Sequence, residues 1–463
     1  MNKTQLSSIF QQQKFKNILT FLGCAFCLLM PAFYSGYPIV YFDTASYVYT
    51  AASLHVPVDR PVTYGLFIKI ASLFGLSLWG VIWAQTFIVV YFLRNICRKL
   101  LKNYYSNSIF CCIILALTVF TSASWYCAQI MADIFTPILV LSVIDFYLTP
   151  DLHKKQKFIS FFMIAFFMEM HNSHLLTVLL FCVLARFYAL VTQNKWFIKK
   201  TMFLFGITLF SFVSISFFNL WEGNSFRPSA GSHVFFMARM AENGVLDKFL
   251  QEYCPVEHYN LCNYQGRTGD QAIGFIWSGD GPLAQSGGWD KVQKEYNTII
   301  FRSLTRPKYL ALQIYKSIEG TLRQLPQFTF IVANVSTSSP TYYAIEEHFP
   351  LEVKELRTSG QLTNMFVPIV PFFNGLILIF TTLSLVVVIA LFNKREKNAA
   401  TLNWNFALVI VLIFLGINAF ISATFSTVAE RLQSRLFWLL PFLCILFAIH
   451  FFMSQKEHKE LVR

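Results

Sequence analysis

The sequence predicts an all-α polytopic membrane protein with about ten transmembrane helices. Of its 463 residues, 55% are hydrophobic and only 13% are charged. Its apolar runs are about 18 to 22 residues long, enough for a helix to cross about 30 Å of hydrocarbon. Backbone groups in lipid must bond within their own segment, and the alternating pattern of a membrane barrel is absent. Lysine and arginine clusters follow alternate runs, as the positive-inside rule requires.

The first seven spans make up residues 1–220. They are expected at 17–35, 77–93, 108–122, 129–148, 157–170, 174–192 and 201–219. Because Lys3, Lys14 and Lys16 precede the first span, we expect a cytoplasmic N-terminus. No small-residue cleavage site follows, so that span is interpreted as an anchor and not a signal peptide. The first outer loop, 36–76, is expected to carry short interfacial helices.

Residues 221–363 form one long hydrophilic segment, which we interpret as a periplasmic helical cap. Apolar side chains recur at helical spacing over 232–250, and 290–325 predicts two helices broken near Arg306–Pro307. The region 220–362 holds 13 basic and 14 acidic residues, so the net charge of +13 comes from the short loops elsewhere. The basic balance therefore indicates membrane orientation, and no nucleic-acid partner is expected.

Residues 364–463 supply three C-terminal spans and a tail. The spans are expected at 365–392, 403–422 and 436–453. Lys394, Arg395 and Lys397 follow the first of them, and Lys456 and Lys459 follow the last. Both termini are therefore predicted to be cytoplasmic, in a multi-pass protein of a bacterial inner membrane.

Two cysteines of the cap segment are candidates for a disulfide. Eight of the ten cysteines fall in or beside spans, whereas Cys254 and Cys262 lie close together in the outer segment. An oxidising periplasm allows such a pair to form a bond. Two free thiols are the alternative.

Asp43 is the first candidate catalytic residue. It lies in the first outer loop, near Tyr47, whose aromatic ring is a candidate substrate contact, and ahead of Arg60. An acidic group at the mouth of a span is costly to hold there without a function. A carboxylate at this depth can accept a proton from a sugar or lipid hydroxyl. The alternative is a helix N-cap for the segment that starts near Ser46.

Asp133 is the second candidate, at the predicted outer start of the fourth span. The helix dipole alone favours an aspartate in a first turn. Its predicted depth matches that of Asp43, however, and two carboxylates facing one cavity can divide base and orienting roles or bind a divalent cation. No other cofactor is indicated, and the metal requirement stays open.

His171 and His174 are three residues apart, at the outer boundary of the fifth and sixth spans. Such a pair can ligate a metal, but no third ligand accompanies it. We interpret both as polar residues that contact substrate.

Arg431 and Arg435 are four residues apart, so on a helix they share a face. They lie in an outer loop, against the orientation rule, and the guanidinium fork suits phosphate oxygens. The expected ligand is a lipid phosphate, with Arg60 as a further contact; ordinary lipid head groups are the alternative. Residues that open the cap segment are candidates for the same anion: Arg227, His233 and Arg239.

This arrangement resembles the GT-C superfamily of glycosyltransferases, which use polyprenyl-phosphate sugars. The resemblance covers mainly 1–220: an acid in the first outer loop, interfacial helices, an acid at the outer start of span four, and a large loop after span seven. It implies that Asp43 matches the catalytic carboxylate and Asp133 the second acid. In addition, 231–239 and 431–441 are similar to segments of a group of bacterial membrane proteins to which no activity is assigned.

Two features depart from the GT-C pattern. Many members have paired acids in the first loop, whereas Thr44 follows Asp43 here, and the usual large soluble C-terminal domain is missing. Metal dependence and substrate are therefore left open by the resemblance.

The sequence-based hypothesis is an inner-membrane glycosyltransferase that moves a sugar from a polyprenyl-phosphate donor to an envelope glycan or lipid. No P-loop and no dinucleotide-binding turn is present, so a soluble nucleotide donor is not expected. One rival is an O-antigen ligase- or polymerase-like enzyme that uses arginine and histidine. The other is a lipid or glycan transporter without chemistry. The oligomeric state is not indicated.

Overall fold

The computed structural model describes residues 3–266, 271–392 and 399–462. Within these ranges the chain is helical, and one parallel bridge, between Ile39 and Gln129, is its only extended pairing. Six of the described segments are long and apolar enough to cross a membrane, by length and composition. They are α5 (Trp79–Leu101), α10 (Asn172–Val191), α11 (Lys195–Trp221), α20 (Ile369–Phe392), α21 (Ala399–Phe425), and the consecutive pair α22 (Glu430–Phe437) and α23 (Leu439–Val462). The predicted all-α membrane class is therefore confirmed.

The remaining predicted spans fall on shorter or interrupted helices. These are α1 (Lys3–Leu28) with α2 (Met30–Ser35), α6 (Asn107–Phe120), α8 (Phe135–Leu148) and α9 (Lys154–Met168). Helix α2 starts with Pro31 in its first turn and ends at Gly36, whose φ of 75° suits glycine at a helix C-terminus. The predicted cytoplasmic cluster Lys394, Arg395 and Lys397 lies outside the described residues.

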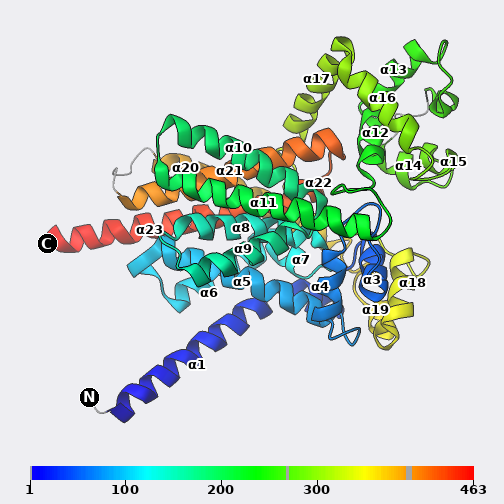
Figure 1. Ribbon diagram of the computed structural model, residues 1–463. Helices are drawn as coiled ribbons and strands as arrows, with labels where there is room; N and C mark the ends of the chain where they lie inside the picture. Colours follow the sequence, from blue (N-terminus) through cyan, green and yellow to red (C-terminus); the bar gives the residue numbers. More distant parts are fainter. Residues whose placement is uncertain (1–2, 267–270, 393–398, 463) are drawn as a thin grey trace.

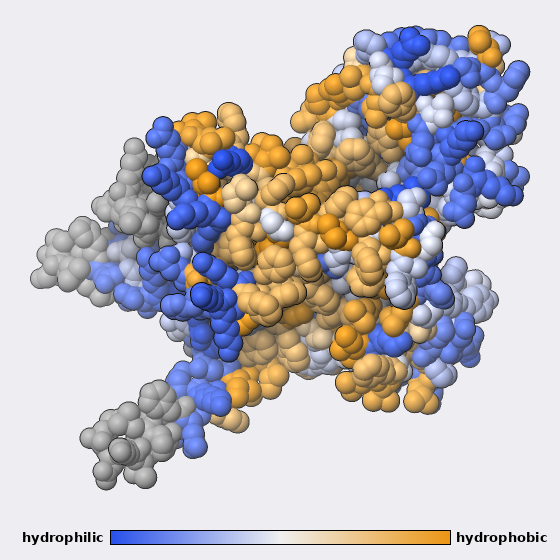
Figure 2. Space-filling model, in the orientation of Figure 1, coloured by the Kyte–Doolittle hydropathy of each residue, from blue (hydrophilic) through white to orange (hydrophobic). Residues whose placement is uncertain are grey.

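The long helices lie side by side, and both chain ends lie at one end of this bundle (Figure 1). Helices α12 to α17 lie at the opposite end, which we call the cap end (Figure 1). The face drawn in Figure 2 has a broad apolar belt between two hydrophilic ends. Such a belt is the surface that a bilayer covers in a helical membrane protein.

Helices α12 to α17 form a unit with its own apolar core, which we call the cap. Its helices are α12 (Ser232–Glu242), α13 (Val245–Tyr253), η3 (Asn260–Tyr264), α14 (Ala272–Trp277), α15 (Pro282–Gln285), α16 (Gln293–Thr305) and α17 (Pro307–Gln324). Val234, Phe249, Tyr296 and Tyr309 are at most 1% exposed in this core. Gly244, with a φ of 75°, separates the first two helices.

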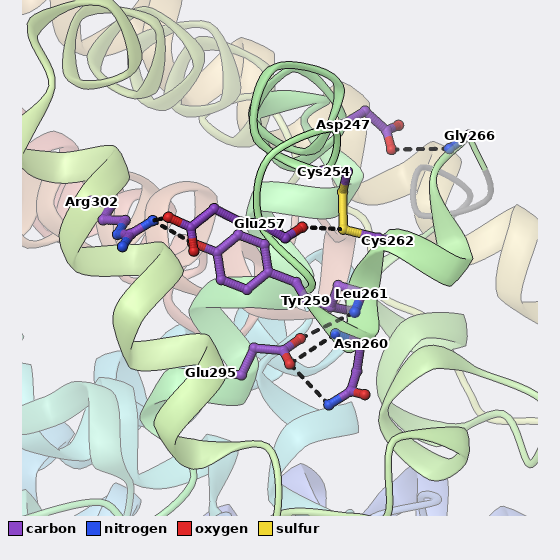
Figure 3. The surroundings of a disulfide bond; sticks show 10 residues. All are labelled: Asp247, Cys254, Glu257, Tyr259, Asn260, Leu261, Cys262, Gly266, Glu295 and Arg302. Atoms are coloured by element: carbon purple, nitrogen blue, oxygen red, sulfur yellow. Dashed lines mark hydrogen bonds and ion pairs between the residues drawn. A yellow bond between two sulfur atoms is a disulfide. The ribbon is translucent and has the colours of Figure 1, made fainter.

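A disulfide joins Cys254 to Cys262 in the cap (Figure 3). Beside it, Arg302 of α16 donates to Glu257 at 2.5 Å and to the Tyr259 hydroxyl at 2.8 Å. The bond and these contacts fasten the loop after α13 onto α16.

Residues 326–363 do not join the cap, although the sequence analysis placed them in the same segment. Their helices α18 (Pro340–His348), η4 (Pro350–Glu352) and α19 (Val353–Thr358) pack with α3 (Thr44–Ser53) and the core of the bundle. Buried Glu352 accepts hydrogen bonds from Tyr37, Ser77 and the Leu78 amide, at the start of α5. A carboxylate there complements the positive end of the helix dipole.

Candidate functional site

Two loops at the cap end are paired through their backbones, and this pairing brings the two candidate aspartates together. The Ile39 amide donates to the Ala128 carbonyl at 2.9 Å, and the Ile130 amide donates to the Ile39 carbonyl at 2.8 Å. The Thr44 hydroxyl donates to the Ile130 carbonyl at 2.9 Å. Asp43 and Asp133 follow these contacts in their respective loops.

Asp43 occupies the N-cap position of α3, but its side chain makes no capping hydrogen bond. It faces two arginines instead. Arg431 donates to its Oδ2 at 2.6 Å, and Arg60 donates to its Oδ1 at 3.2 Å. The side chain is 27% exposed. The geometry therefore favours the electrostatic interpretation of Asp43 over helix capping.

These partners control the protonation of Asp43. Burial would raise the pKa of this carboxyl, but the positive charges and hydrogen bonds of Arg431 and Arg60 outweigh burial and lower the pKa to about 2. Asp43 is thus a carboxylate at neutral pH, and a weak proton acceptor as long as both guanidinium groups stay in place.

Asp133 and Arg435 form the most deeply buried ion pair of the cluster. Arg435 donates to Oδ1 of Asp133 at 2.5 Å, and the two side chains are 1% and 2% exposed. A second guanidinium nitrogen of Arg435 donates to the Asn418 side chain at 3.3 Å. Two atoms of this pair, Asp133 Oδ2 and Arg435 Nε, are buried without a hydrogen-bond partner. Buried polar atoms usually have partners, so these two mark an incomplete network.

Arg431 lies between the two aspartates. Its Nε is 3.6 Å from Asp133 Oδ2, while its Nη1 bonds to Asp43. Its guanidinium carbon lies 4.4 Å from the centroid of the Tyr41 ring, which is a cation–π contact. The Tyr126 hydroxyl donates to the Arg431 carbonyl at 3.2 Å. Because α22 places Arg431 and Arg435 one turn apart, a single short helix serves both aspartates.

A third carboxylate, which the sequence analysis did not select, completes the cluster. Asp59 accepts from its neighbour Arg60 at 2.9 Å, and both side chains are nearly buried. Arg60 also lies 4.7 Å from the centroid of Tyr47. Three carboxylates thus face three guanidinium groups, so the cluster is neutral without a ligand. The adjacent pair Asp59–Arg60 was a signal available in the sequence.

His171 is close enough to the arginines of this cluster for their charges to act on it, and His174 is held by other hydrogen bonds. Burial, the Arg435 guanidinium, His174 and Arg431 all lower the pKa of His171 well below its usual range. Its Nδ1 accepts from the Ser173 amide at 3.2 Å. His174 is 1% exposed and bonds to Thr136 and to the Phe167 carbonyl. Among the described residues no three His, Cys, Asp or Glu side chains are arranged to hold a metal.

The three candidates at the start of the cap have other partners. Arg239 pairs with Glu242 at 2.5 Å and donates to the Ala423 carbonyl at 2.6 Å. His233 contacts the Trp289 carbonyl at 3.3 Å. Arg227 reaches Gln293 at 3.5 Å. These partners lie apart from Asp43 and Asp133, so the structure does not gather the three residues into the anion site that the sequence suggested.

Solvent reaches the cluster mainly at Asp43 and Arg431, whose side chains are 27% and 21% exposed, and less at Arg60, which is 12% exposed. These groups can meet an anion and a hydroxyl from outside the protein. A small hollow lined by Trp125, Phe330 and other residues includes Tyr126, whose hydroxyl bonds to the Arg431 carbonyl. The chemistry available here is proton transfer at a carboxylate and binding of a phosphate.

No family model, curated protein or solved structure matches this chain. The geometry of the cluster is therefore the basis for its interpretation.

Proposed function

We propose that this chain is a GT-C-like glycosyltransferase of a bacterial inner membrane. In this account it has ten spans, both termini in the cytoplasm and the cap end in the periplasm. The observation that carries the proposal is that one arginine, Arg431, is shared by the partly exposed Asp43 and the buried Asp133. The proposed catalytic base, Asp43, is thereby hydrogen-bonded to the proposed phosphate-binding residue, Arg431.

The donor we propose is a polyprenyl-phosphate sugar. Its hydrocarbon tail suits the apolar belt of Figure 2, and its phosphate suits the guanidinium groups of Arg431 and Arg60. A lipid-linked donor reaches this site sideways through the bilayer. The acceptor is an envelope glycan or lipid with a free hydroxyl.

In this mechanism, binding of the donor makes Asp43 a stronger base. The donor phosphate competes with Asp43 for Arg431, and loss of that ion pair raises the pKa of Asp43 from about 2. The acceptor hydroxyl then gives its proton to Asp43, and its oxygen forms a bond to the anomeric carbon. The bond from that carbon to the phosphate oxygen breaks, and the lipid phosphate leaves with the bonding electrons. Arg431 and Arg60 stabilise its negative charge.

Asp133 and Arg435 act through position in this mechanism. The sequence predicted that Arg435 contacts the phosphate. In the structure its side chain is 1% exposed and is bonded to Asp133 and Asn418, so it is not placed to meet a phosphate directly. The buried pair instead fixes α22 and, with it, the direction of Arg431. Asp133 is a positioning residue here and not a second base.

The test is sugar transfer by the full chain in proteoliposomes, from a labelled polyprenyl-phosphate sugar to an envelope lipid extract. Asp43→Asn removes the proton acceptor and should lower the rate by at least about 100-fold, the usual scale of general base catalysis. Asp145→Asn is the matched control, because Asp145 pairs with Lys99 in the other half of the bundle. It should keep the rate within about twofold. Equal rates for wild type and Asp43→Asn would remove the mechanism.

A ligase-like reaction is the second candidate, and the position of His171 favours it. The imidazole of His171 is neutral because burial and the charges of the arginines lower its pKa, so it is a weak proton acceptor until an anionic substrate offsets those charges. That reading requires His171→Gln to abolish transfer while Asp43→Asn and Asp133→Asn remain active. A transporter would move labelled lipid across vesicles with no product formed.

A further inference from the structure

Helix α17 exposes an apolar face that a water-covered helix would bury. Its members recur every fourth residue, which places them on one side of a helix. They are Leu310, Ile314, Ile318 and Leu322, with exposed fractions of 39%, 52%, 54% and 65%. We call this set the α17 stripe. At 1.5 Å per residue it extends over about 18 Å.

The buried side of α17 carries three polar residues. Gln313, Ser317 and Gln324 are 6%, 4% and 0% exposed, and neither amide atom of Gln313 has a hydrogen-bond partner. A helix in water has the reverse distribution, with apolar residues inward. The distribution of polar and apolar residues on α17 therefore indicates that the stripe faces an apolar medium.

The position of α17 places the stripe against the membrane belt. Helix α17 packs on α21, and Gly320 approaches Ala423 so closely that an added Cβ would lie 3.1 Å from the alanine Cβ. In Figure 1, α17 lies at the edge of the bundle and is steeply inclined to the long helices. In Figure 2 the apolar surface of this region joins the belt of the bundle.

Charged and aromatic residues flank the stripe as they do at membrane interfaces. Tyr315 is 61% exposed beside it. Lys316 and Arg323 share Glu319 through contacts at 2.8 Å and 2.5 Å. Tyrosine rings and long basic side chains favour the head-group layer, where an apolar stem and a polar tip are both satisfied.

We propose that α17 lies in the plane of the membrane, with the stripe in contact with the acyl chains of the leaflet on the cap side. The occupant is lipid, because the stripe continues the belt that lipid covers. Helix α17 is also linked to the functional site. The Gln324 side chain donates to the Ala429 carbonyl at 2.8 Å and accepts from the Ala429 amide at 2.9 Å. Ala429 directly precedes α22, so the seated helix fixes the start of the arginine helix. This inference does not depend on the proposed reaction.

The test uses nitroxide labels on the full chain in phosphatidylethanolamine–phosphatidylglycerol bilayers. Ile314→Cys and Ile318→Cys are labelled in a background where Cys27, Cys111 and Cys112 are serine; the other free cysteines are buried. Ile379→Cys on α20 is the belt reference, since this side chain is 59% exposed. Asn297→Cys, exposed on α16, is the water reference. Collisions with oxygen, which enters lipid, are compared with collisions with a water-soluble nickel chelate.

The ratio of oxygen to nickel collisions at Ile314 and Ile318 should match that at Ile379 within about twofold and exceed that at Asn297 at least tenfold. A ratio equal to that at Asn297 would place the stripe in water and overturn the proposal. Low collision rates with both reagents, together with spin broadening that disappears on dilution with unlabelled chain, would overturn it in favour of a second copy as the occupant.

Discussion

The bundle buries charges at both ends, and the two groups are built differently. Away from the cap, Lys200 is 8% exposed and donates to the Phe146 carbonyl at 2.5 Å and to the Thr149 carbonyl, at the end of α8. Lys99 donates to Asp145 at 2.7 Å. Free carbonyls at a helix C-terminus attract such cations, so the fold alone explains this group.

At the cap end the arginines form ion pairs with carboxylates from segments that are far apart in the sequence. Arg431 joins Asp43 across 388 positions, and Arg435 joins Asp133 across 302. Two buried atoms, Asp133 Oδ2 and Arg435 Nε, lack hydrogen-bond partners, and one side of the cluster is open. Helix capping explains none of this. The comparison teaches that a complete set of partners marks a structural charge, whereas an incomplete one points to a ligand.

The largest stability effect is expected for Asp133→Asn. It leaves the Arg435 guanidinium buried without a compensating charge, which typically costs about 3–5 kcal/mol in free energy of unfolding. Reversible unfolding of the purified protein in mixed micelles measures this loss. The double variant Asp133→Asn/Arg435→Gln should recover more than half of it, because no charge is then stranded. A single-variant loss below about 1 kcal/mol would contradict the account.

Lys200→Met should lower the same free energy by about 2–3 kcal/mol, because the carbonyls at the end of α8 lose a charged donor. Sugar transfer per folded molecule should stay within about twofold of wild type. A loss of transfer as large as that of Asp43→Asn would break the comparison, since both ends would then be functional.

A smaller, pH-dependent effect is expected at Asp43. Its pKa falls from about 3.8 in the unfolded chain to about 2 in the folded one. A lowered pKa contributes stability above the unfolded value, on the order of 2 kcal/mol, which is lost as the pH falls through the folded value. The stability difference between wild type and Asp43→Asn should therefore shrink by roughly half between pH 6 and pH 3. A difference that does not change over this range would show that the arginines do not hold the carboxylate.

The sequence pattern reached the helical class and the break between α16 and α17 because local signals determine them. Apolar run length predicts membrane helices, and Pro307 restricts the residue before it. It also selected Asp43, Asp133, Arg431 and Arg435 from charge in unfavourable places, and the structure brings these four side chains together.

Other features depend on long-range packing that periodicity does not encode. Glu352 leaves the cap segment to cap α5, and Arg435 is sequestered by Asn418 as well as Asp133. The sequence predicted that Arg239 binds the same anion as Arg431, but its guanidinium pairs with Glu242 on the same helix. Pairing choices of this kind follow from three-dimensional neighbours, so residue type and depth alone could not predict them.

The most direct test of the central claim is whether a lipid phosphate binds at Arg431. Thermal unfolding of the purified protein should shift upward when polyprenyl phosphate is added, since a ligand that binds the folded state stabilises it. We expect this shift for wild type and for Lys200→Met, and its loss for Arg431→Gln. An equal shift in Arg431→Gln would contradict the account, because the lipid would then be bound elsewhere.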